Sequence, residues 1–457
     1  MSVTFLFLGF VFFSLLMVAR LMPTLLALPL MATWIAIVSE ISFTDWLNEI
    51  LLKGSLRLSA PIILVIFGAM FARVIQKTGI SNEIIKNAAE LSGDKPIAIA
   101  ILMTGATAFV FLGMSGLGTI IMIGSIAIPI MTSAGIEPID AAILILLGML
   151  TGASLNFAGA ATGIAIFGAE AVLQYFIPIA VVSLIITVAY IVINIPHSKG
   201  TLSSLLVILK EFFTAIISVP ISLLKTIAKV FTKQNSSLIK KKQSLPTAAL
   251  ISPILPLIVI AVINFTVGLG SDKGEINPVA AAVLGFLFAS FYAALLTKPK
   301  QAINLFTGSL VEGIKDIAGV LFLFIGIGML ITATTQEAAI KILNPMINAV
   351  MPSSFFGVLV FFTVLAPLAL YRGPFNMYGM GSGIATILTG LNFMPSSSLY
   401  GIFSGVGFIQ SIADPTNSQN TWLAGYAGVD TTSILKKILP YAWAACILTM
   451  ILVAIIR

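Results

Sequence analysis

Leu370-Tyr-Arg372-Gly-Pro-Phe-Asn376 and Ile412-Ala-Asp414-Pro-Thr-Asn417-Ser-Gln-Asn420 are two polar breaks in a long apolar region. Arg372 and Asp414 are the only charged residues between positions 342 and 429. A charge at bilayer depth costs about 3 kcal/mol on insertion scales, so a charge found there usually faces a cavity, an ion or a ligand. The sequence therefore predicts that these two breaks form a functional site inside a membrane.

Composition places the chain among the multi-pass helical membrane proteins. Of its 457 residues, 59% are hydrophobic and 9% are charged, and its mean hydropathy is +1.11. A soluble core cannot bury so much apolar surface, whereas the lipid bilayer accepts it. We expect an integral protein of the cytoplasmic (inner) membrane. The first apolar stretch lacks a small-residue cleavage pattern, so we expect a retained helix and no signal peptide.

Several function classes are disfavoured by the residues that the chain lacks. Cys446 is the only cysteine and His197 the only histidine, which excludes disulfide frameworks and zinc clusters within one chain. No Gly-x-x-x-x-Gly-Lys-[Ser/Thr] phosphate loop occurs, which argues against ATP-driven chemistry. The net charge of +7 arises from lysines in short loops, so no nucleic-acid partner is expected.

Apolar windows of the length that crosses a bilayer, about 17–25 residues, recur along the chain. They lie near residues 3–19, 22–39, 59–76, 174–195, 247–268, 277–297, 317–334 and 438–456. Two further apolar regions, 96–132 and 354–391, are interrupted by a polar tip and resemble re-entrant hairpins. Residues 138–168 and 396–427 break internally, as discontinuous helices do.

The order of these pieces repeats in the two halves, 1–199 and 247–457. Each half contains about five crossings plus a re-entrant hairpin and a broken helix. An odd number of crossings inverts the second half relative to the first. We therefore predict an all-α polytopic protein of two inverted repeats, an organisation typical of secondary transporters.

A lysine-rich connector, residues 200–246, predicts the sidedness of the chain. It contains Lys240-Lys241-Lys242, and positively charged loops remain in the cytoplasm. The remaining charges follow: Arg20, Arg73, Lys77, Lys298, Lys300, Lys436 and Lys437 are expected inside, and Glu40, Asp45 and Glu49 outside. Both termini are then external, and the two hairpins enter from opposite sides. The connector itself is expected to be a basic amphipathic linker on the membrane surface.

Broken helices expose N–H and C=O groups that lipid cannot satisfy, so these groups face protein, water, an ion or a substrate. Half-helix N-termini attract carboxylates, and carbonyls with side-chain oxygens surround hard cations. We predict substrate contacts from Arg372, Asn376, Ser115, Ser154 and Asn156. We predict coupling-cation contacts from Asp414, Thr416, Asn417, Asn420 and Thr119. The alternative for the small residues is close helix packing.

The two charged residues keep several interpretations open. The fork of Arg372 matches a carboxylate, but it could instead bridge to Asp414 or extend to the membrane interface. Asp414 could ligate sodium, accept a coupling proton, or neutralise Arg372 when no substrate is bound. The expected partners are a small organic anion and a coupling cation, sodium or a proton. Beyond such a sodium ion, no metal or cofactor is expected.

The duplicated order of a polar-tipped hairpin and a broken helix resembles the ion transporter superfamily, which includes dicarboxylate, citrate and gluconate permeases. The segments Gly68-Ala-Met-Phe71 and Ser81 to Asp94 are similar in layout to the gluconate and citrate branches, over residues 55–450. The dicarboxylate branch has Ser-Asn-Thr tips, where this chain has Met114-Ser115-Gly116 and Arg372-Gly373-Pro374. The resemblance implies cation-coupled uptake of an organic anion by a homodimer that moves one domain against a scaffold.

Two other classes are weaker alternatives. A channel would carry rings of polar residues along continuous helices, whereas polarity here is concentrated at two positions. An intramembrane enzyme needs a nucleophile with a base, or a set of metal ligands. His197 lies in a Pro-His-Ser turn, and no His/Asp/Glu cluster occurs within a predicted span. We therefore expect a carrier and not an enzyme.

Overall fold

The chain is helical throughout the part that the computed structural model describes. That part comprises residues 2–19, 21–93, 95–195, 245–268 and 277–456. These residues contain no strand, so the predicted all-α polytopic fold is confirmed. Most of the connector 200–246, with the Lys240 to Lys242 run, lies outside the described residues, as does Arg20.

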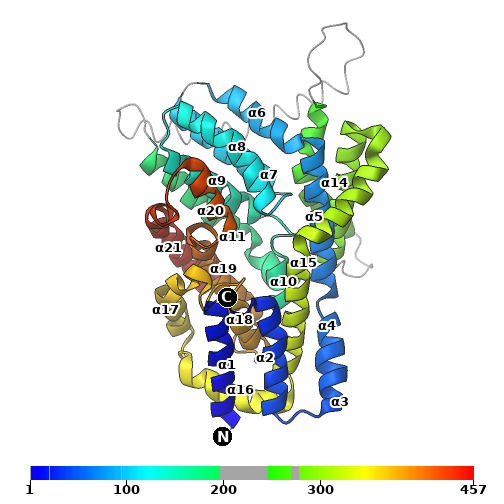
Figure 1. Cartoon of the computed structure of the whole chain (residues 1–457), viewed down its shortest axis with the longest axis vertical. Coiled ribbons are helices and arrows are strands. Elements are labelled where there is room, and N and C mark those ends of the chain that lie inside the picture. Colours follow the sequence, from blue (N-terminus) through cyan, green and yellow to red (C-terminus); the bar gives the residue numbers. More distant parts are fainter. Residues whose placement is uncertain (1, 20, 94, 196–244, 269–276, 457) are drawn as a thin grey trace.

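The helices follow the same order in two series (Figure 1). The first is α1 (Ser2–Val18), α2 (Thr24–Val38), α3 (Phe43–Asp45), η1 (Trp46–Lys53), α4 (Gly54–Leu56), α5 (Ser59–Thr78), α6 (Ile80–Ser92), α7 (Pro96–Phe111), α8 (Leu117–Ser133), α9 (Pro138–Ala153), α10 (Ala161–Phe167) and α11 (Ala169–Asn194). The second is η2 (Thr247–Ile254), α13 (Leu255–Gly268), α14 (Pro278–Thr297), η3 (Pro299–Gln301), α15 (Ala302–Thr334), α16 (Glu337–Val350), α17 (Phe355–Leu365), η4 (Ala366–Arg372), α18 (Gly381–Gly390), α19 (Ser396–Ala413), α20 (Ser418–Ala427) and α21 (Thr431–Ile456).

The two series run in opposite directions through the molecule. In Figure 1 the amphipathic helix α6 lies at the top and its counterpart α16 at the bottom. Hairpin α7–α8 belongs to the upper half and hairpin α17–α18 to the lower half, so the tips approach the middle from opposite ends. This is the arrangement of inverted repeats. The domain limits 1–199 and 247–457 remain a prediction.

Six helical segments of the described chain are long and apolar enough to cross a membrane. They are Phe43–Thr78, Ala169–Asn194, Pro278–Thr297, Pro299–Thr334, Phe355–Arg372 and Thr431–Ile456. Two begin well before the predicted apolar windows, because residues 43–56 and 302–316 are helical although they mix charged and apolar side chains. In α15, Glu312 and Asp316 form ion pairs with Lys77 and Arg73 of α5. A hydropathy window overlooks a helix whose charges a neighbouring helix neutralises.

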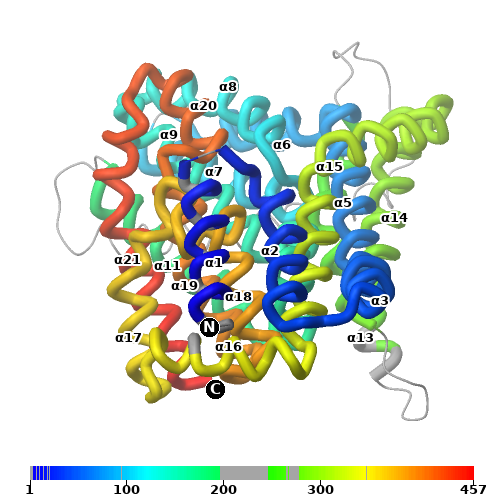
Figure 2. Tube along the Cα trace, turned by 60° about the horizontal axis from the view of Figure 1, so that its bottom comes forward, coloured from blue at the N-terminus to red at the C-terminus, as the bar shows by residue number. Residues whose placement is uncertain are grey.

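The helices pack as two bodies (Figure 2). In the first, which we call the span body, α15 lies against α2 and α5, α14 lies against α5 and α13, and α1 packs on α2. The second, which we call the hairpin body, contains both hairpins, both broken helices, α11 and α21. Small residues allow close approach: a Cβ on Gly328 would lie 2.3 Å from the Gly54 oxygen, and one on Gly152 would lie 2.1 Å from the Ala108 oxygen.

An ion pair between a half-buried lysine and a buried aspartate connects three helices of the hairpin body. The carboxylate of Asp140, in the first turn of α9, accepts from the Lys437 ammonium of α21 and from the Tyr190 hydroxyl of α11, each at 2.6 Å. Asn194 Nδ2 of α11 donates to the Tyr441 hydroxyl of α21 at 2.7 Å. Breaking a buried pair leaves an uncompensated charge, which is strongly destabilising. These contacts join α9, α11 and α21 within the hairpin body, while α18 of the second hairpin also packs on α15 of the span body.

Candidate functional site

The tip of the second hairpin is held in an unusual backbone conformation. Tyr371 has φ +55° and Arg372 has φ +58°, the left-handed region that side chains rarely adopt. Two such residues in succession cost about 1–3 kcal/mol each, and they persist only where the surroundings impose the conformation. The turn points the N–H groups of both residues in one direction, which creates a small concave site for an anion.

The carboxylate of Asp414 occupies this concave site. Its Oδ1 accepts from the Tyr371 N–H at 3.1 Å, and its Oδ2 accepts from the Arg372 N–H at 3.2 Å and from Asn376 Nδ2 at 3.2 Å. Thr416 adds its N–H at 2.9 Å and its hydroxyl at 2.7 Å, both to Oδ1. Asp414 is fully buried. Two carboxylate oxygens offer about four lone-pair positions, so these donors saturate it and fix the tip against the break between α19 and α20.

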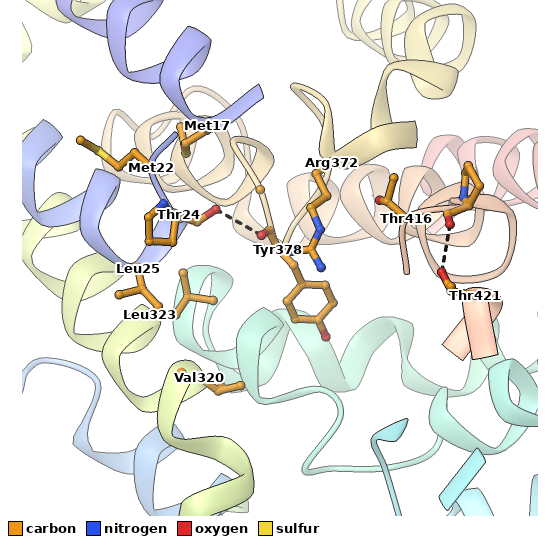
Figure 3. A pocket seen from close by; sticks show the side chains of 14 residues that line it. Met17, Met22, Thr24, Leu25, Val320, Leu323, Arg372, Tyr378, Thr416 and Thr421 are labelled. Carbon is orange, nitrogen blue, oxygen red and sulfur yellow. Dashed lines mark hydrogen bonds between the residues drawn. The ribbon is translucent and has the colours of Figure 1, made fainter. Parts of the chain in front are cut away.

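The Arg372 side chain extends from this tip into a large cavity, as Figure 3 shows. It is exposed, and no ion pair or side-chain hydrogen bond of its guanidinium occurs within the described part of the chain. Its contact with Asp414 runs through the main-chain N–H and not through the guanidinium. The predicted bridge between the two charged side chains is therefore not formed in this conformation, and the cation is available to a ligand.

The cavity has a volume of about 710 Å³ and lies between the two bodies. The span body contributes Met17, Met22, Pro23, Thr24 and Leu25 from the α1–α2 corner, and Gly319, Val320 and Leu323 from α15. The hairpin body contributes Arg372, Tyr378, Gly379, Pro415, Thr416 and Thr421. One hydrogen bond crosses between the bodies here, from the Thr24 hydroxyl to the Tyr378 oxygen at 3.2 Å. Cavities of this size hold drug-sized ligands.

A second, smaller cavity of about 140 Å³ lies inside the hairpin body. Tyr378 lines both cavities. The remaining wall comes from the start of α10, including Gly163, and from α19, including Tyr400, Phe403 and Gly407. The smaller cavity is therefore built where the two broken helices meet, next to the tip that carries Arg372.

The first hairpin tip is held by Asn156, which occupies the position in the first half that corresponds to Asp414 in the second. Asn156 and Asp414 lie equally far along the chain from the first residues of their helices, Pro138 and Ser396. Asn156 is buried, and its Nδ2 donates to the tip carbonyls of Phe111 at 3.0 Å and Met114 at 2.9 Å. The polarity of the two contacts is thus opposite, because Asn156 donates to its tip and Asp414 accepts from its tip.

Four of the five predicted cation ligands, Asp414, Thr416, Asn417 and Asn420, lie at the break between α19 and α20, whereas Thr119 lies at the first hairpin. Asn417 Nδ2 donates to the Gln410 oxygen at 2.6 Å, and Asn420 Nδ2 donates to the oxygens of Ile412 at 2.9 Å and Asp414 at 3.0 Å. The amides thereby satisfy carbonyls that the helix break sets free. The Oδ1 atom of Asn420 is buried and has no hydrogen-bond partner.

Of the ten predicted site residues, only Arg372 and Thr416 line a described cavity. The four predicted residues of the first half, Ser115, Thr119, Ser154 and Asn156, line neither. Ser115 is exposed at the first tip, and Thr119 is buried behind it, with its hydroxyl donating to the Ser115 oxygen at 3.0 Å. Ser154 faces α11, where its hydroxyl donates to the Thr151 oxygen at 2.8 Å and lies 3.3 Å from the Ser183 hydroxyl. The structure brings Arg372, Asn376, Asp414 and Thr416 together at one tip, but Ser154 and Asn156 remain with their own half.

Sequence reasoning missed the span-body side of the cavity. Thr24, Gly319, Val320 and Leu323 lie in ordinary apolar segments, and no local signal separates them from packing residues. Tyr378 could have been found, because it lies within the glycine-rich break after Arg372, where a large side chain has room to face a ligand.

Comparison with known proteins is consistent with this architecture. A model of the Na⁺/H⁺ antiporter family matches residues 1–155. The crystal structure of the YdaH transporter of Alcanivorax borkumensis is similar over 99% of this chain and 98% of that chain, with a TM-score of 0.60 and 13% sequence identity. No curated protein matches significantly by sequence. The fold is that of a membrane transporter and not of an enzyme, and the two matches together support a secondary, cation-coupled transporter.

Proposed function

We propose that the chain is a secondary carrier that takes up an organic carboxylate together with a coupling cation. The observation that carries this proposal is the Arg372 guanidinium, which enters a cavity of about 710 Å³ without an acidic partner in the described chain. A fixed cation in such a place needs an anion, and a guanidinium fork matches a carboxylate by two parallel hydrogen bonds. The cavity lies between two bodies, where alternating access would expose it to each side in turn.

We place the coupling cation at the break beside Asp414. The unpartnered Asn420 oxygen and the carboxylate of Asp414 are oxygen ligands of the kind that hard cations prefer. Because Asp414 is saturated with donors here, a sodium ion or a proton would bind only as the tip donors withdraw. Cation binding and tip position would then be coupled, as carrier transport requires.

Exchange of sodium for protons without an organic substrate is a second candidate, because the matching family model is that of Na⁺/H⁺ antiporters. The matched residues, 1–155, exclude both Arg372 and Asp414. A cavity whose described wall contains a free arginine repels a cation that would enter alone. Sodium flux into proteoliposomes under a proton gradient, with no carboxylate present, would favour exchange over the carrier proposal.

Gly319 allows a direct test of anion binding. It lines the cavity on α15, and a Cβ added there meets no atom within 4 Å. Gly319→Asp places a negative charge in the cavity, whereas Gly319→Asn adds the same volume without charge. Near a protein surface, two like charges a few ångströms apart repel by a few kcal/mol. We expect the aspartate variant to lose at least tenfold in apparent affinity for the transported carboxylate, relative to the asparagine variant. Equal affinities in the two variants would argue against an anion in this cavity.

We further propose that the protein lies in the cytoplasmic membrane as a homodimer and works by an elevator movement. The separation of the helices into a span body and a hairpin body supports this mechanism, because the hairpin body contains both tips. The span body would form the scaffold and the contact between protomers.

Sidedness follows from the connector, whose lysine run should face the cytoplasm while both termini are external. We expect an impermeant amine reagent to leave Lys240 to Lys242 unmodified in intact cells and to modify them in inverted vesicles. A tag at either terminus, accessible from outside, is the positive control. Modification of the connector in intact cells would reverse the topology and with it the side from which each hairpin enters.

A further inference from the structure

We propose, resting on the proposed function, that the substrate is a monocarboxylate with an apolar body, such as a medium-chain fatty acid or an arylalkanoate. Dicarboxylates, citrate and polyhydroxy acids such as gluconate would then be poor ligands. The inference rests on the charge of the cavity wall, on hydrogen bonds that its hydroxyls already make, and on the smaller cavity behind Tyr378.

Charge limits the substrate to one carboxylate. Arg372 is the only charged side chain of the described cavity wall. Asp414 does not add to the charge of the wall, because its carboxylate is turned toward the tip and accepts main-chain and amide donors there. A second carboxylate of the substrate would have no cationic partner, and an unpaired charge taken out of water costs several kcal/mol.

The threonine hydroxyls of the wall already donate their protons within the protein, which leaves the phenol of Tyr378 as the one hydroxyl of the described wall that is free to donate to a ligand. Thr24 donates to the Tyr378 oxygen, Thr416 donates to the Asp414 carboxylate, and Thr421 donates to the oxygens of Pro415 and Asn417. Figure 3 shows the first and the last of these threonines bound to their acceptors. Each threonine hydroxyl has one proton, so none remains to donate to the oxygens of a sugar acid.

The rest of the wall is suited to hydrocarbon. Met17, Met22, Leu25, Val320 and Leu323 face the cavity from the span body. Burial of apolar surface is worth roughly 25 cal/mol per Å², and thioether side chains adapt to irregular apolar shapes. Binding of an alkyl or aryl body would therefore be favourable here. The hydroxyl groups of a polyol would lose hydrogen bonds to water that these apolar side chains cannot replace.

The smaller cavity has the size to hold the far end of the substrate's apolar body. Its volume of about 140 Å³ is close to the cavity of about 150 Å³ that is known to hold a benzene molecule in another protein. Phe167, Tyr400 and Phe403 contribute aromatic rings to its wall, and Thr162, Ser404 and Gln410 add a few polar groups. Tyr378 lines both cavities, so a ligand that reaches from one to the other would contact its side chain. A carboxylate on Arg372 and a ring or chain end behind Tyr378 fit this pair of cavities.

The test is a thermal-shift titration of the purified full-length protein with hexanoate, phenylacetate, gluconate, succinate and citrate at constant sodium and pH. Ligands stabilise the native state by mass action. We expect half-saturation by hexanoate and phenylacetate at concentrations at least tenfold lower than by the other three. The Arg372→Gln variant measures binding that does not depend on the guanidinium. Arg57→Gln is its matched control, because it makes the same change at an exposed arginine that lines neither cavity. Gluconate, succinate or citrate binding as tightly as hexanoate would overturn the inference.

A pair of glycine variants tests the smaller cavity. Gly407 lines it, Gly425 of α20 does not, and a Cβ on either meets no atom within 4 Å. Gly407→Leu should weaken phenylacetate at least tenfold, whereas Gly425→Leu should leave it unchanged. Wild-type affinity in Gly407→Leu would remove the smaller cavity from the site. If no carboxylate binds, or if Arg372→Gln binds them all equally well, the proposed function itself fails. A reversed preference that still depends on Arg372 overturns only the inference about the substrate.

Discussion

Arg372→Ala should abolish saturable carboxylate uptake while the protein still assembles in the membrane. The side chain extends into the cavity and makes no ion pair within the described chain, so its removal breaks no internal contact. The backbone that fixes the tip remains, because Asp414 binds the main-chain N–H groups of Tyr371 and Arg372 and not the guanidinium. The loss should therefore appear in binding and not in folding.

Arg372→Lys should lose less, because lysine keeps the charge but not the fork. A charge-assisted hydrogen bond is worth roughly 1.5 to 3 kcal/mol, so its loss lowers affinity by about one to two decades. Counterflow in proteoliposomes measures apparent affinity, and size-exclusion of the purified variants checks assembly. If Arg372→Ala transports with wild-type apparent affinity, the guanidinium does not recognise the anion. The alternatives, a bridge to Asp414 in another conformation or extension to the interface, would then replace that role.

The order of the helices could be predicted from the sequence because each membrane-crossing helix needs a long apolar segment, which can be recognised in the sequence. Apolar windows and polar breaks gave the hairpins and broken helices within a few residues of α7–α8, α9–α10, α17–α18 and α19–α20. Hydropathy windows missed helical residues where a neighbouring helix neutralises their charges. The first half of α15 contains Glu312 and Asp316, so a hydropathy window excludes it from the predicted span. In the structure, Lys77 and Arg73 of α5 neutralise these two carboxylates.

The site could be predicted only on the side where polarity breaks the helix. Arg372 and Asp414 are conspicuous because an apolar region surrounds them, and the structure brings the main-chain N–H of Arg372 to the carboxylate of Asp414. The opposite wall, with Val320 and Leu323, depends on which helices pack across the cavity, and that information is not local. The sequence also could not show that Asp414 would accept from backbone donors, because the residue types Tyr371 and Arg372 give no signal of the left-handed conformation that both adopt.

In both halves a side chain at the helix break holds the hairpin tip, but the two side chains differ in their hydrogen-bonding role. At the first break an amide donates to tip carbonyls, and at the second a carboxylate accepts from tip N–H groups. An amide cannot change its charge, whereas a carboxylate can bind a proton or a sodium ion. Under the proposed function, the first tip is held by a contact that no cation alters, and the second by a contact that a bound cation would release. This difference makes Asp414 the residue at which coupling is expected.

Asp414→Asn should retain the fold but weaken both anion affinity and cation dependence. The amide replaces one acceptor oxygen with an NH₂ group, so at least one of the buried donors from Arg372, Asn376, Tyr371 or Thr416 loses its partner. An unsatisfied buried donor costs about 1–3 kcal/mol. The tip should relax, and apparent affinity for the carboxylate should fall by about one to two decades. Asp414→Ala removes every acceptor and should lose more.

The measurement is uptake over a series of carboxylate concentrations at several sodium concentrations and pH values. Asp430→Asn is the matched control, because it makes the same change at an exposed residue that caps α21 through the Thr432 N–H. If the variant has lower anion affinity but unchanged cation dependence, Asp414 holds the tip in place but does not bind the coupling cation. Unchanged uptake with unchanged dependence on sodium and protons would remove Asp414 from the mechanism, because neither the tip nor the cation would then rely on its carboxylate.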